Sequence, residues 1–342
     1  MNALSSSARP RRQRPSIYDV AERAGVSHMT VSRVLNGHPN IRESTRERVK
    51  AAIDELSYTP SSIARALATN RAMRIGVLVD TPVQYGPNST LRALESAART
   101  AGYAISSFSM SPDEESGIDA GVVDLVTQGV DALCVIAPRL SSLDVLRKHA
   151  TGLPTLVVKA EPDPHMHTAA VDQHAGARLA TSHLIELGHR RILHIAGPLD
   201  WFDARAREQS WREELIAAGL EAIPPTIGDW TSDFGYEVGR FHDLGDATAV
   251  FAANDQMALG LIHGLTERGI RVPEDISVVG FDDLPDARHF LPPLTTVRQD
   301  FAELGALTLR LIIEAIEGDE GTEHEMIQPT LIVRESTAPP RR

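Results

Sequence analysis

Three short apolar stretches of the sequence each end in polar side chains, among them Arg205, Asn254 and Asp282. A guanidinium, an amide and a carboxylate can together form paired hydrogen bonds with neighbouring hydroxyl groups, as a carbohydrate presents them. Trp201 and Trp230 could supply flat apolar surface for the face of a sugar ring. These residue types predict a site for a small polyhydroxylated ligand.

A second group of side chains suited to binding lies near the N-terminus. If the residues from 27 onward form a helix, its outward face carries Ser27, His28, Met29, Ser32, Arg33 and Asn36. Hydrogen-bonding groups, one flexible apolar side chain and one fork-shaped cation suit a surface that reads the major groove of DNA. Plainer interpretations stay open: Arg33 as a phosphate contact, His28 as a backbone contact, and Met29 as a space filler.

The charge distribution favours the same interpretation. Residues 1–71 contain 12 Lys and Arg against 6 Asp and Glu, although the whole chain of 342 residues has a formal net charge of −12. A basic N-terminal part on an acidic body indicates that only the N-terminal part meets a polyanion. Residues 1–15, rich in Ser, Pro and Arg, are predicted to be a disordered leader.

Three short helices are predicted to position the N-terminal side chains, because apolar residues recur at helical spacing between residues 17 and 56. Gly25 permits a tight turn, and Ser27 is a favourable N-cap for the second helix. Ser44 and Glu47 have the spacing of a capping box at the start of the third helix. Two short helices joined through a glycine turn have the proportions of a helix-turn-helix.

The segment that follows predicts a short fourth helix. Thr59 can act as a cap, Pro60 fits the first helical position, and Ile63 and Leu67 share one face. A helix this short is marginal in water by itself. We expect it to form only against its own copy in a dimer or against DNA.

The rest of the chain alternates strands with helices. Apolar stretches are found at 75–79, 103–108, 132–136, 156–158, 169–171, 192–196, 249–252 and 276–281, and helical patterns between them include 91–101, 177–187, 208–218, 257–268 and 301–317. This alternation predicts parallel sheets with helices on both faces. The number of strands fits an α/β body of two Rossmann-like lobes, with the ligand beyond the carboxyl ends of the strands.

The segment Ser-Ile-Tyr-Asp-Val-Ala-Glu-Arg-Ala-Gly-Val-Ser-His-Met-Thr-Val-Ser-Arg-Val-Leu-Asn at 16–36 resembles the DNA-binding signature of the LacI/GalR family of bacterial transcriptional repressors, and 45–49 and 56–60 match its third helix and hinge entry. The resemblance implies that residues 28, 29 and 33 read bases. It also implies that Leu67 is inserted into the minor groove of the operator.

The resemblance extends to the body, whose lobes are similar to periplasmic sugar-binding proteins. It implies a DNA-binding domain at 16–58, a hinge helix and linker at 59–71, a first lobe at 72–171 plus 298–326, and a second lobe at 172–297 plus 327–342. The positions that it implies contact the effector are Arg205, Asn254, Asp282, Trp230 and Phe301. Lys159 departs from the acidic residue that sugar-binding relatives often carry, so no particular sugar is implied.

These observations predict a cytoplasmic, homodimeric repressor of carbohydrate-utilisation genes that a mono- or oligosaccharide releases from a pseudo-palindromic operator. A single reading helix buries too little surface for tight specific binding, so two half-sites are expected. The chain ends after Glu335 in Ser-Thr-Ala-Pro-Pro-Arg-Arg, without a heptad tail, so a dimer is expected rather than a tetramer. Two alternatives remain: a corepressor-type regulator that binds a purine or another small metabolite, and a solute-binding protein that does not bind DNA.

Catalysis, a cofactor and a metal are not expected. The sequence has no glycine-rich phosphate loop and no nucleophile elbow. The histidines between 165 and 194 lack the spacing of a metal site and favour structural roles. No apolar run approaches the ~18 residues that a membrane span needs. The single cysteine, Cys134, lies in an apolar stretch, which predicts a buried thiol in a reducing compartment.

Overall fold

The computed structural model describes residues 15–35, 38–58, 71–80, 84–110, 117–136, 139–140, 143, 146–147, 151–163, 165–318 and 324–341. The chain divides into two compact units, residues 1–72 and 73–342. Several predicted features lie outside the described residues: the leader apart from residue 15, Asn36, and the hinge positions 59–70 with Leu67. None of the helices in the described part combines the length and apolar composition needed to cross a membrane.

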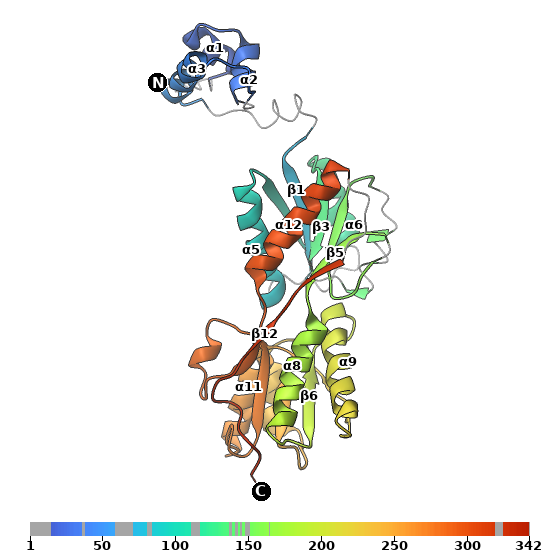
Figure 1. Ribbon diagram of the computed structural model, residues 1–342. Helices are drawn as coiled ribbons and strands as arrows, with labels where there is room; N and C mark the ends of the chain where they lie inside the picture. Colours follow the sequence, from blue (N-terminus) through green and yellow to red (C-terminus); the bar gives the residue numbers. More distant parts are fainter. Residues whose placement is uncertain are drawn as a thin grey trace, which may run out of the picture. The chain divides into compact units, whose positions relative to one another are not determined.

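The described part of the first unit contains three helices, α1 (Ile17–Ala24), α2 (His28–Leu35) and α3 (Glu43–Leu56) (Figure 1). Gly25 ends α1 at a φ of 64°, in the left-handed region that favours glycine. The hydroxyl of Ser27 accepts a hydrogen bond from the Thr30 backbone N–H at 3.2 Å, as an N-cap does. The predicted helix-turn-helix is therefore present.

The capping box lies at a different helix from the one predicted. The Ser16 hydroxyl accepts from the Asp19 N–H, and the Asp19 carboxylate accepts from the Ser16 N–H, so the box opens α1. α3 begins at Glu43, before Ser44, and its N-cap Arg42 makes no side-chain capping bond. The prediction at Ser44 was wrong because the N-cap is Arg42, two residues earlier, which places Ser44 inside the first turn of the helix.

The apolar faces of the three helices close a small core. Its buried members are Val20, Ala21, Ala24, Val31, Val34, Val49, Ala52 and Tyr58. An ion pair between Arg23 and Glu55, 2.6 Å apart, joins α1 to α3 on the outside. The core fixes the orientation of α2, so the side chains on its outer face have a defined direction.

The second unit contains two six-stranded sheets. The first consists of β1 (Arg74–Asp80), β2 (Ala104–Met110), β3 (Ala132–Ile136), β4 (Thr155–Val158), β5 (His167–Val171) and β11 (His324–Ile327), in the order β11-β5-β4-β3-β1-β2. All its neighbouring strands are parallel. We call this sheet with its helices the first lobe.

The second sheet defines the second lobe. It consists of β6 (Ile192–Ala196), β7 (Thr226–Ile227), β8 (Ala249–Ala252), β9 (Ser277–Asp282), β10 (Thr295–Arg298) and β12 (Thr330–Ile332), in the order β12-β10-β9-β8-β6-β7. Only the edge strand β12 runs antiparallel to its neighbour.

Helices cover both faces of each sheet (Figure 1). In the first lobe α5 (Tyr85–Thr100) and α12 (Phe301–Glu317) pack side by side on one face, and α6 (Gly117–Thr127) covers the other. In the second lobe α8 (Gln173–Glu186) and α9 (Phe202–Ala217) share one face, while α10 (Ser232–Phe241) and α11 (Asp255–Glu267) pack together over the other. A short 3₁₀ helix, η1 (Ala287–His289), precedes β10. This is the predicted pair of Rossmann-like lobes.

The chain passes between the lobes at three places: from β5 to α8 at Asp172, from β10 to α12 at residues 299–300, and from β11 to β12 at residues 328–329. Several helices start earlier than the sequence pattern indicated. α9 begins at Phe202 rather than near residue 208, and α8 at Gln173 rather than near 177. Their first turns lie at the lobe junction, where polar residues are buried and the amphipathic pattern is weak.

Candidate functional site

A cavity with an empty volume of about 630 Å³ lies between the two lobes. The first lobe contributes Gln84, Tyr85, Gly86, Pro87, Thr90, Ile136, Val158, Lys159, Ala170, Val171, Phe301 and Leu304, and the second contributes Gln173, Trp201, Asp203, Arg207, Trp230, Asn254, Asp282 and Gln299. Many of these residues lie at or just beyond the carboxyl ends of parallel strands, where α/β sheets bind ligands. The cavity therefore has the location that the sequence predicted.

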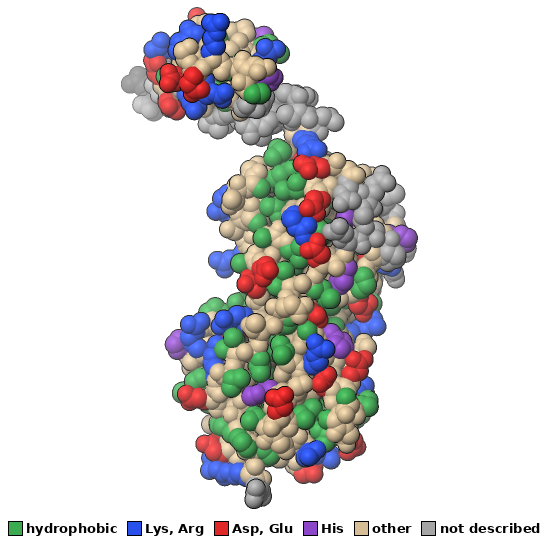
Figure 2. All heavy atoms as spheres, in the orientation of Figure 1, with side chains coloured by type: hydrophobic (Ala, Val, Ile, Leu, Met, Phe, Trp, Pro, Cys, Tyr) green, Lys and Arg blue, Asp and Glu red, His purple; other side chains and the backbone are tan. Residues whose placement is uncertain are grey.

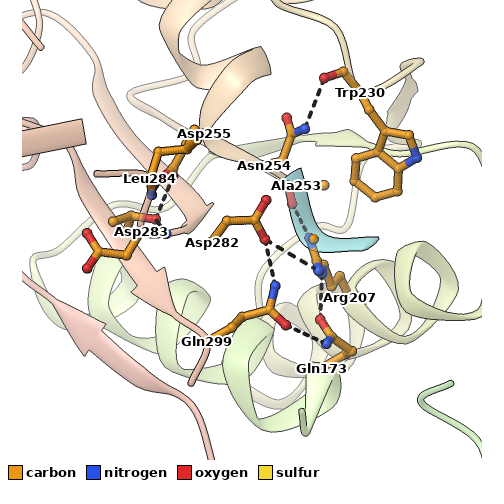
Figure 3. Close-up of polar contacts among 12 residues, drawn as sticks. Gln173, Arg207, Trp230, Ala253, Asn254, Asp255, Asp282, Asp283, Leu284 and Gln299 are labelled. Carbon is orange, nitrogen blue, oxygen red and sulfur yellow. Dashed lines mark hydrogen bonds and ion pairs between the residues drawn. The ribbon is translucent and has the colours of Figure 1, made fainter. Parts of the chain in front are cut away.

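A chain of hydrogen bonds links Arg207 to Asp282 along the cavity wall (Figure 3). Arg207 Nε donates to Gln173 Oε1 at 2.8 Å, Gln173 Nε2 donates to Gln299 Oε1 at 2.9 Å, and Gln299 Nε2 donates to Asp282 Oδ1 at 2.6 Å. All four side chains are buried. The side-chain amides of Gln173 and Gln299 each donate one hydrogen bond and accept another, so each side chain in the chain fixes the orientation of the next.

Arg207 is further held by its surroundings. Its Nη1 donates to the carbonyl oxygen of Ala253, and its guanidinium carbon lies 3.8 Å from the centre of the Phe281 ring. Burial raises the pKa of Asp282 to about 6, against the opposing effects of the Arg207 charge and the Gln299 hydrogen bond. Burial likewise raises the pKa of Asp203, one turn before Arg207 on α9. The wall thus presents a fixed guanidinium between two desolvated carboxyl groups.

Arg205 does not line this cavity. It is exposed on α9, whereas Asp203 and Arg207, four residues apart, share the face of the helix that turns inward. The sequence pattern indicated a helix from residue 208, with Arg205 before it, but the helix already begins at Phe202. Two residues along a helix turn a side chain by roughly 200°, so Arg205 points away from the site that Arg207 occupies.

Asn254 lines the cavity and also organises its wall. Its Oδ1 accepts from the Met257 N–H at 2.9 Å, which caps α11, and its Nδ2 donates to the Trp230 carbonyl at 3.0 Å. The side chain therefore holds the Trp230 backbone in place, and its second amide hydrogen remains available to a ligand.

Two residues of the wall have backbone conformations that side chains disfavour. Trp230 has a φ of 72° and Asp282 a φ of 110°. Holding a residue other than glycine in such a sparsely populated backbone conformation costs roughly 1–3 kcal/mol of folding free energy. Residues of this kind are concentrated at functional sites. The strain at both positions supports a role for them in binding.

Aromatic rings reach the cavity from both lobes. Trp201 and Trp230 meet edge to face, with ring centres 5.8 Å apart, and on the opposite lobe Tyr85 and Phe301 do the same at 5.7 Å. Trp201, Trp230 and Phe301 were predicted at the site and line it here, whereas Tyr85 was not predicted. These rings can pack against the apolar face of a flat ligand.

Asp255 and Asp283 brace the loop after β9 and do not line the cavity. Asp255 accepts from the Thr296 hydroxyl at 2.6 Å and from the Leu284 N–H at 2.8 Å (Figure 3), and burial raises its pKa well above the usual value. Asp283 pairs with Arg298 and Arg334. Both therefore support the backbone turn that carries Asp282.

Lys159 lines the first-lobe side of the cavity but is turned into the protein. It is 3% exposed, and its Nζ lies 3.2 Å from Asp163 Oδ2 and 4.7 Å from the centre of the Phe202 ring. The cavity lining thus contains two basic side chains, Lys159 and Arg207, and two acidic ones, Asp203 and Asp282.

The outer face of α2 is the candidate DNA-binding surface of the first unit, whose charged groups are visible in Figure 2. Ser27, His28, Met29 and Arg33 are exposed, with Met29 54% exposed, and Ser32 is half-buried. Tyr18 of α1, which was not predicted at this surface, is 64% exposed, and its ring lies tilted against that of His28 with ring centres 5.0 Å apart. An exposed tyrosine beside an apolar stripe was the signal that could have identified it.

Gln173, Gln299, Asp203 and Arg207 were also missed. Glutamine and buried arginine carry no distinctive spacing, and all four lie within one or two residues of a lobe crossing or in the first two turns of α9. A search for polar residues next to predicted crossings could have found the two glutamines. Among the described residues no group of His, Cys, Asp or Glu could hold a metal ion.

Comparison with family models gives two matches. The model described as bacterial regulatory proteins, lacI family, matches residues 16–61. The model described as a periplasmic binding protein-like domain matches residues 181–337.

Three relatives illustrate the similarity over the whole chain. The lactose operon repressor of Escherichia coli (strain K12) is 35% identical over 332 residues, covering 95% of this chain and 91% of that protein. The HTH-type transcriptional repressor PurR of Haemophilus influenzae (strain PittEE) is 36% identical over 333 residues, covering 94% and 98%. The HTH-type transcriptional regulator CelR of Thermobifida fusca is 36% identical over 342 residues, covering 95% and 99%.

Two solved structures, of a lac repressor and of a CelR regulator, are similar as well. The lac repressor dimer bound to operator and the anti-inducer ONPF superposes with a TM-score of 0.84 at 33% identity, covering 95% of this chain and 100% of that one. The complex of CelR with cellobiose gives a TM-score of 0.71 at 33% identity, covering 94% and 100%. These relatives are regulators and not enzymes.

Proposed function

Because the chain belongs to the LacI family of bacterial regulatory proteins, we propose that it is a homodimeric repressor that binds operator DNA and releases it when a sugar binds between its lobes. The observation that carries the proposal is the buried chain from Arg207 through Gln173 and Gln299 to Asp282, which crosses one wall of an aromatic cavity. DNA as the ligand supports a cytoplasmic location.

The cavity offers the groups that a sugar needs. Arg207 supplies donors and Asp282 supplies an acceptor, so neighbouring hydroxyls can bridge the two in the manner of a bidentate contact. Trp230 from the second lobe and Phe301 from the first supply apolar surface for the ring faces. The cellobiose complex of CelR supports a carbohydrate as the effector class.

The charges of the lining favour a neutral effector. The two cations, Lys159 and Arg207, are matched by the two carboxylates, Asp203 and Asp282. Asp163, which contacts Lys159 behind the lining, is balanced in turn by Arg147. A phosphorylated or acidic sugar would bring an unmatched charge into a buried site, which is costly. We therefore favour an unmodified mono- or oligosaccharide over a sugar phosphate or a uronic acid.

DNA binding is assigned to α2, with Arg33, His28 and Met29 as base-reading residues and Ser27 and Ser32 beside them. The sequence assigns Asn36 to the same surface and Leu67 to the minor groove. A sugar that touches both lobes stabilises one lobe arrangement, and this population shift separates the paired hinges and withdraws Leu67. A coupling of roughly 1–3 kcal/mol gives a 5–150-fold change in operator affinity.

A selected operator tests both halves of the proposal. The purified protein is used to select binding sites from random duplex DNA, and release is followed by fluorescence anisotropy with neutral sugars, uronic acids, sugar phosphates and purines. We expect a palindromic site, salt-dependent binding and release by a neutral sugar alone. Failure to bind any duplex at low ionic strength would overturn the DNA-binding half.

A purine effector is the second candidate, because PurR relatives are as similar in sequence as the lac repressor. Aromatic rings from both lobes could also hold a flat base on its two faces. In the same assay a corepressing purine would tighten operator binding, whereas the proposed sugar weakens it, so the direction of the change separates the two candidates.

A further inference from the structure

One apolar side chain of the second lobe lies inside the core of the first. Phe202, the first residue of α9, is 5% exposed and belongs to the apolar cluster that contains Leu143, Leu146 and Val157. All other buried members of that cluster come from the first lobe, within residues 78–157. Separating the lobes would therefore remove Phe202 from the apolar core of the first lobe and expose its ring to water.

Lys159 covers the same ring from the first lobe. Its Nζ lies 4.7 Å from the centre of the Phe202 ring, 3.2 Å from Asp163 Oδ2 and 3.4 Å from the Pro162 carbonyl oxygen. Burying an ammonium is costly unless other groups replace its hydration. Asp163 and Pro162 hold the ammonium within its own lobe, and the ring face of Phe202 supplies a further attraction that exists only while the lobes are together.

The backbone on either side of Phe202 is also attached to the first lobe. Leu140 N donates to the Asp200 carbonyl at 2.9 Å, and Trp201 forms an antiparallel bridge with Arg139. Arg139 is itself fixed by two hydrogen bonds to Asp80, at 3.0 and 2.9 Å. Three interactions therefore attach the segment 200–202 to the first lobe: backbone pairing, burial of the Phe202 ring in the apolar core, and the contact of that ring with the Lys159 ammonium.

Phe202 stands between two residues that face the effector cavity. Its neighbours Trp201 and Asp203 both line the cavity, and Asp203 is followed one turn later by Arg207. A shift of Phe202 must shift these neighbours because they share its helix start. The position of Phe202 in the first lobe therefore sets the position of one cavity wall.

We propose that Phe202 and Lys159 form a latch that holds the two lobes together and positions Trp201 and Asp203 for the effector. Phe202 is a positioning residue, since its ring points into the core of the first lobe and not into the cavity. That the cavity binds an effector rests on the proposed function, but the latch is a contact of the protein alone. Its presence before binding reduces the ordering that an effector must bring about.

Hydrogen exchange of the full-length protein tests the latch without effector or DNA. The Leu140 amide reports the contact, because its acceptor is Asp200 of the other lobe. We expect this amide to exchange at least tenfold faster in Phe202→Ala and severalfold faster in Lys159→Met. The Val278 amide, bonded to Ser336 within the second lobe, should keep its rate. Phe241→Ala is the matched control, since Phe241 is 70% exposed at the end of α10.

A double-mutant cycle separates the latch from general loosening and uses the milder Phe202→Leu, which keeps apolar bulk and removes the ring face. Lys159→Met should accelerate Leu140 exchange in the wild-type background and have no effect in the Phe202→Leu background. Lys159→Arg should restore most of the protection, because a guanidinium also binds ring faces. Equal effects of Lys159→Met in both backgrounds, or equal acceleration at Leu140 and Val278, would overturn the proposal.

Discussion

Arg207 and Asp282 face each other across the cavity wall with Arg207 Nη2 3.8 Å from Asp282 Oδ1, too far for a direct hydrogen bond. The two are joined instead through Gln173 and Gln299. Among the described residues no hydrogen bond occupies Asp282 Oδ2. The pair is therefore held at a separation that leaves hydrogen-bonding capacity for a ligand.

Arg207→Lys should abolish the effector response and preserve operator binding. Lysine keeps the charge between Asp203 and Asp282 but cannot reproduce the fork that contacts Gln173 and Ala253. We expect effector affinity to fall by roughly 30-fold or more, since losing a buried charged contact costs about 2–5 kcal/mol. Calorimetry with the sugar found in the release assay measures the affinity, and anisotropy measures operator binding.

Arg205→Lys is the matched control, because Arg205 is exposed on the opposite face of the same helix. It should leave effector affinity within twofold of wild type. A large loss in Arg205→Lys together with normal binding by Arg207→Lys would show that the cavity described here is not the effector site.

Asp282→Asn should stabilise the second unit at neutral pH and hardly at pH 4. The pKa of Asp282 is raised from 3.8 to about 6 by burial, so the folded state holds its proton more tightly than the unfolded state. The contribution of Asp282 to stability is therefore most favourable below about pH 4 and is lost as pH rises through 6. A shift of this size corresponds to roughly 3 kcal/mol above pH 6, which Asn, as a neutral analogue, should recover.

Thermal midpoints of the wild type and of Asp282→Asn, measured from pH 4 to 8, check this expectation. Asp203 and Asp255 also have raised pKa values, and because the Asp282 charge contributes to the shift at Asp255, the variant should relieve part of that shift as well. Parallel pH profiles for the two proteins would contradict a desolvated carboxyl group at position 282. The variant should also lose effector binding, as expected when function maintains an unfavourable buried charge.

The architecture could be predicted from the sequence because strands and helices alternate with clear periodicity, and apolar stretches such as 192–196 and 249–252 recur unchanged as β6 and β8. Asp282, Asn254 and Trp230 could be placed because each lies at the carboxyl end of a strand or within three residues of it. Arg207 could not, because its inward direction depends on α9 starting at Phe202, and that start is fixed by insertion of Phe202 into the other lobe. Tertiary contact there overrides the local pattern.

Arg33→Ala should weaken operator binding, and the manner of weakening identifies its contact. If Arg33 reads a base, affinity falls by about 1–3 kcal/mol and specificity at one position of each half-site is relaxed. If it holds a phosphate, all sequences lose affinity alike and the slope of log K against log salt falls by about 1. Binding to a set of single-base operator variants at several salt concentrations distinguishes these outcomes.

Arg23→Ala serves as the control for Arg33→Ala. Arg23 also lies on the surface of the first unit, but it pairs with Glu55 of α3 at 2.6 Å. Solvent-exposed ion pairs of this kind contribute little to stability, so folding should be retained. An equal loss of operator affinity in both variants would contradict a specific role of α2.

Gly197→Ala should disable the cavity through Trp230. A Cβ at position 197 would lie 2.1 Å from Cζ2 of the Trp230 ring, so the indole must move from the wall. Forcing extra atoms into a packed site typically costs about 1–3 kcal/mol. We expect a lower thermal midpoint and loss of effector binding, with operator binding retained because the first unit is untouched.

The substitution Trp230→Phe in the same chain should reverse part of this effect. The smaller ring lacks the Cζ2 and Cη2 atoms that an added methyl group at 197 meets, so the double variant should be more stable than Gly197→Ala alone. Calorimetric unfolding of the two single variants and the double variant gives the interaction free energy. Strictly additive effects would mean that Gly197 is required for its backbone alone, and that Trp230 does not pack against it.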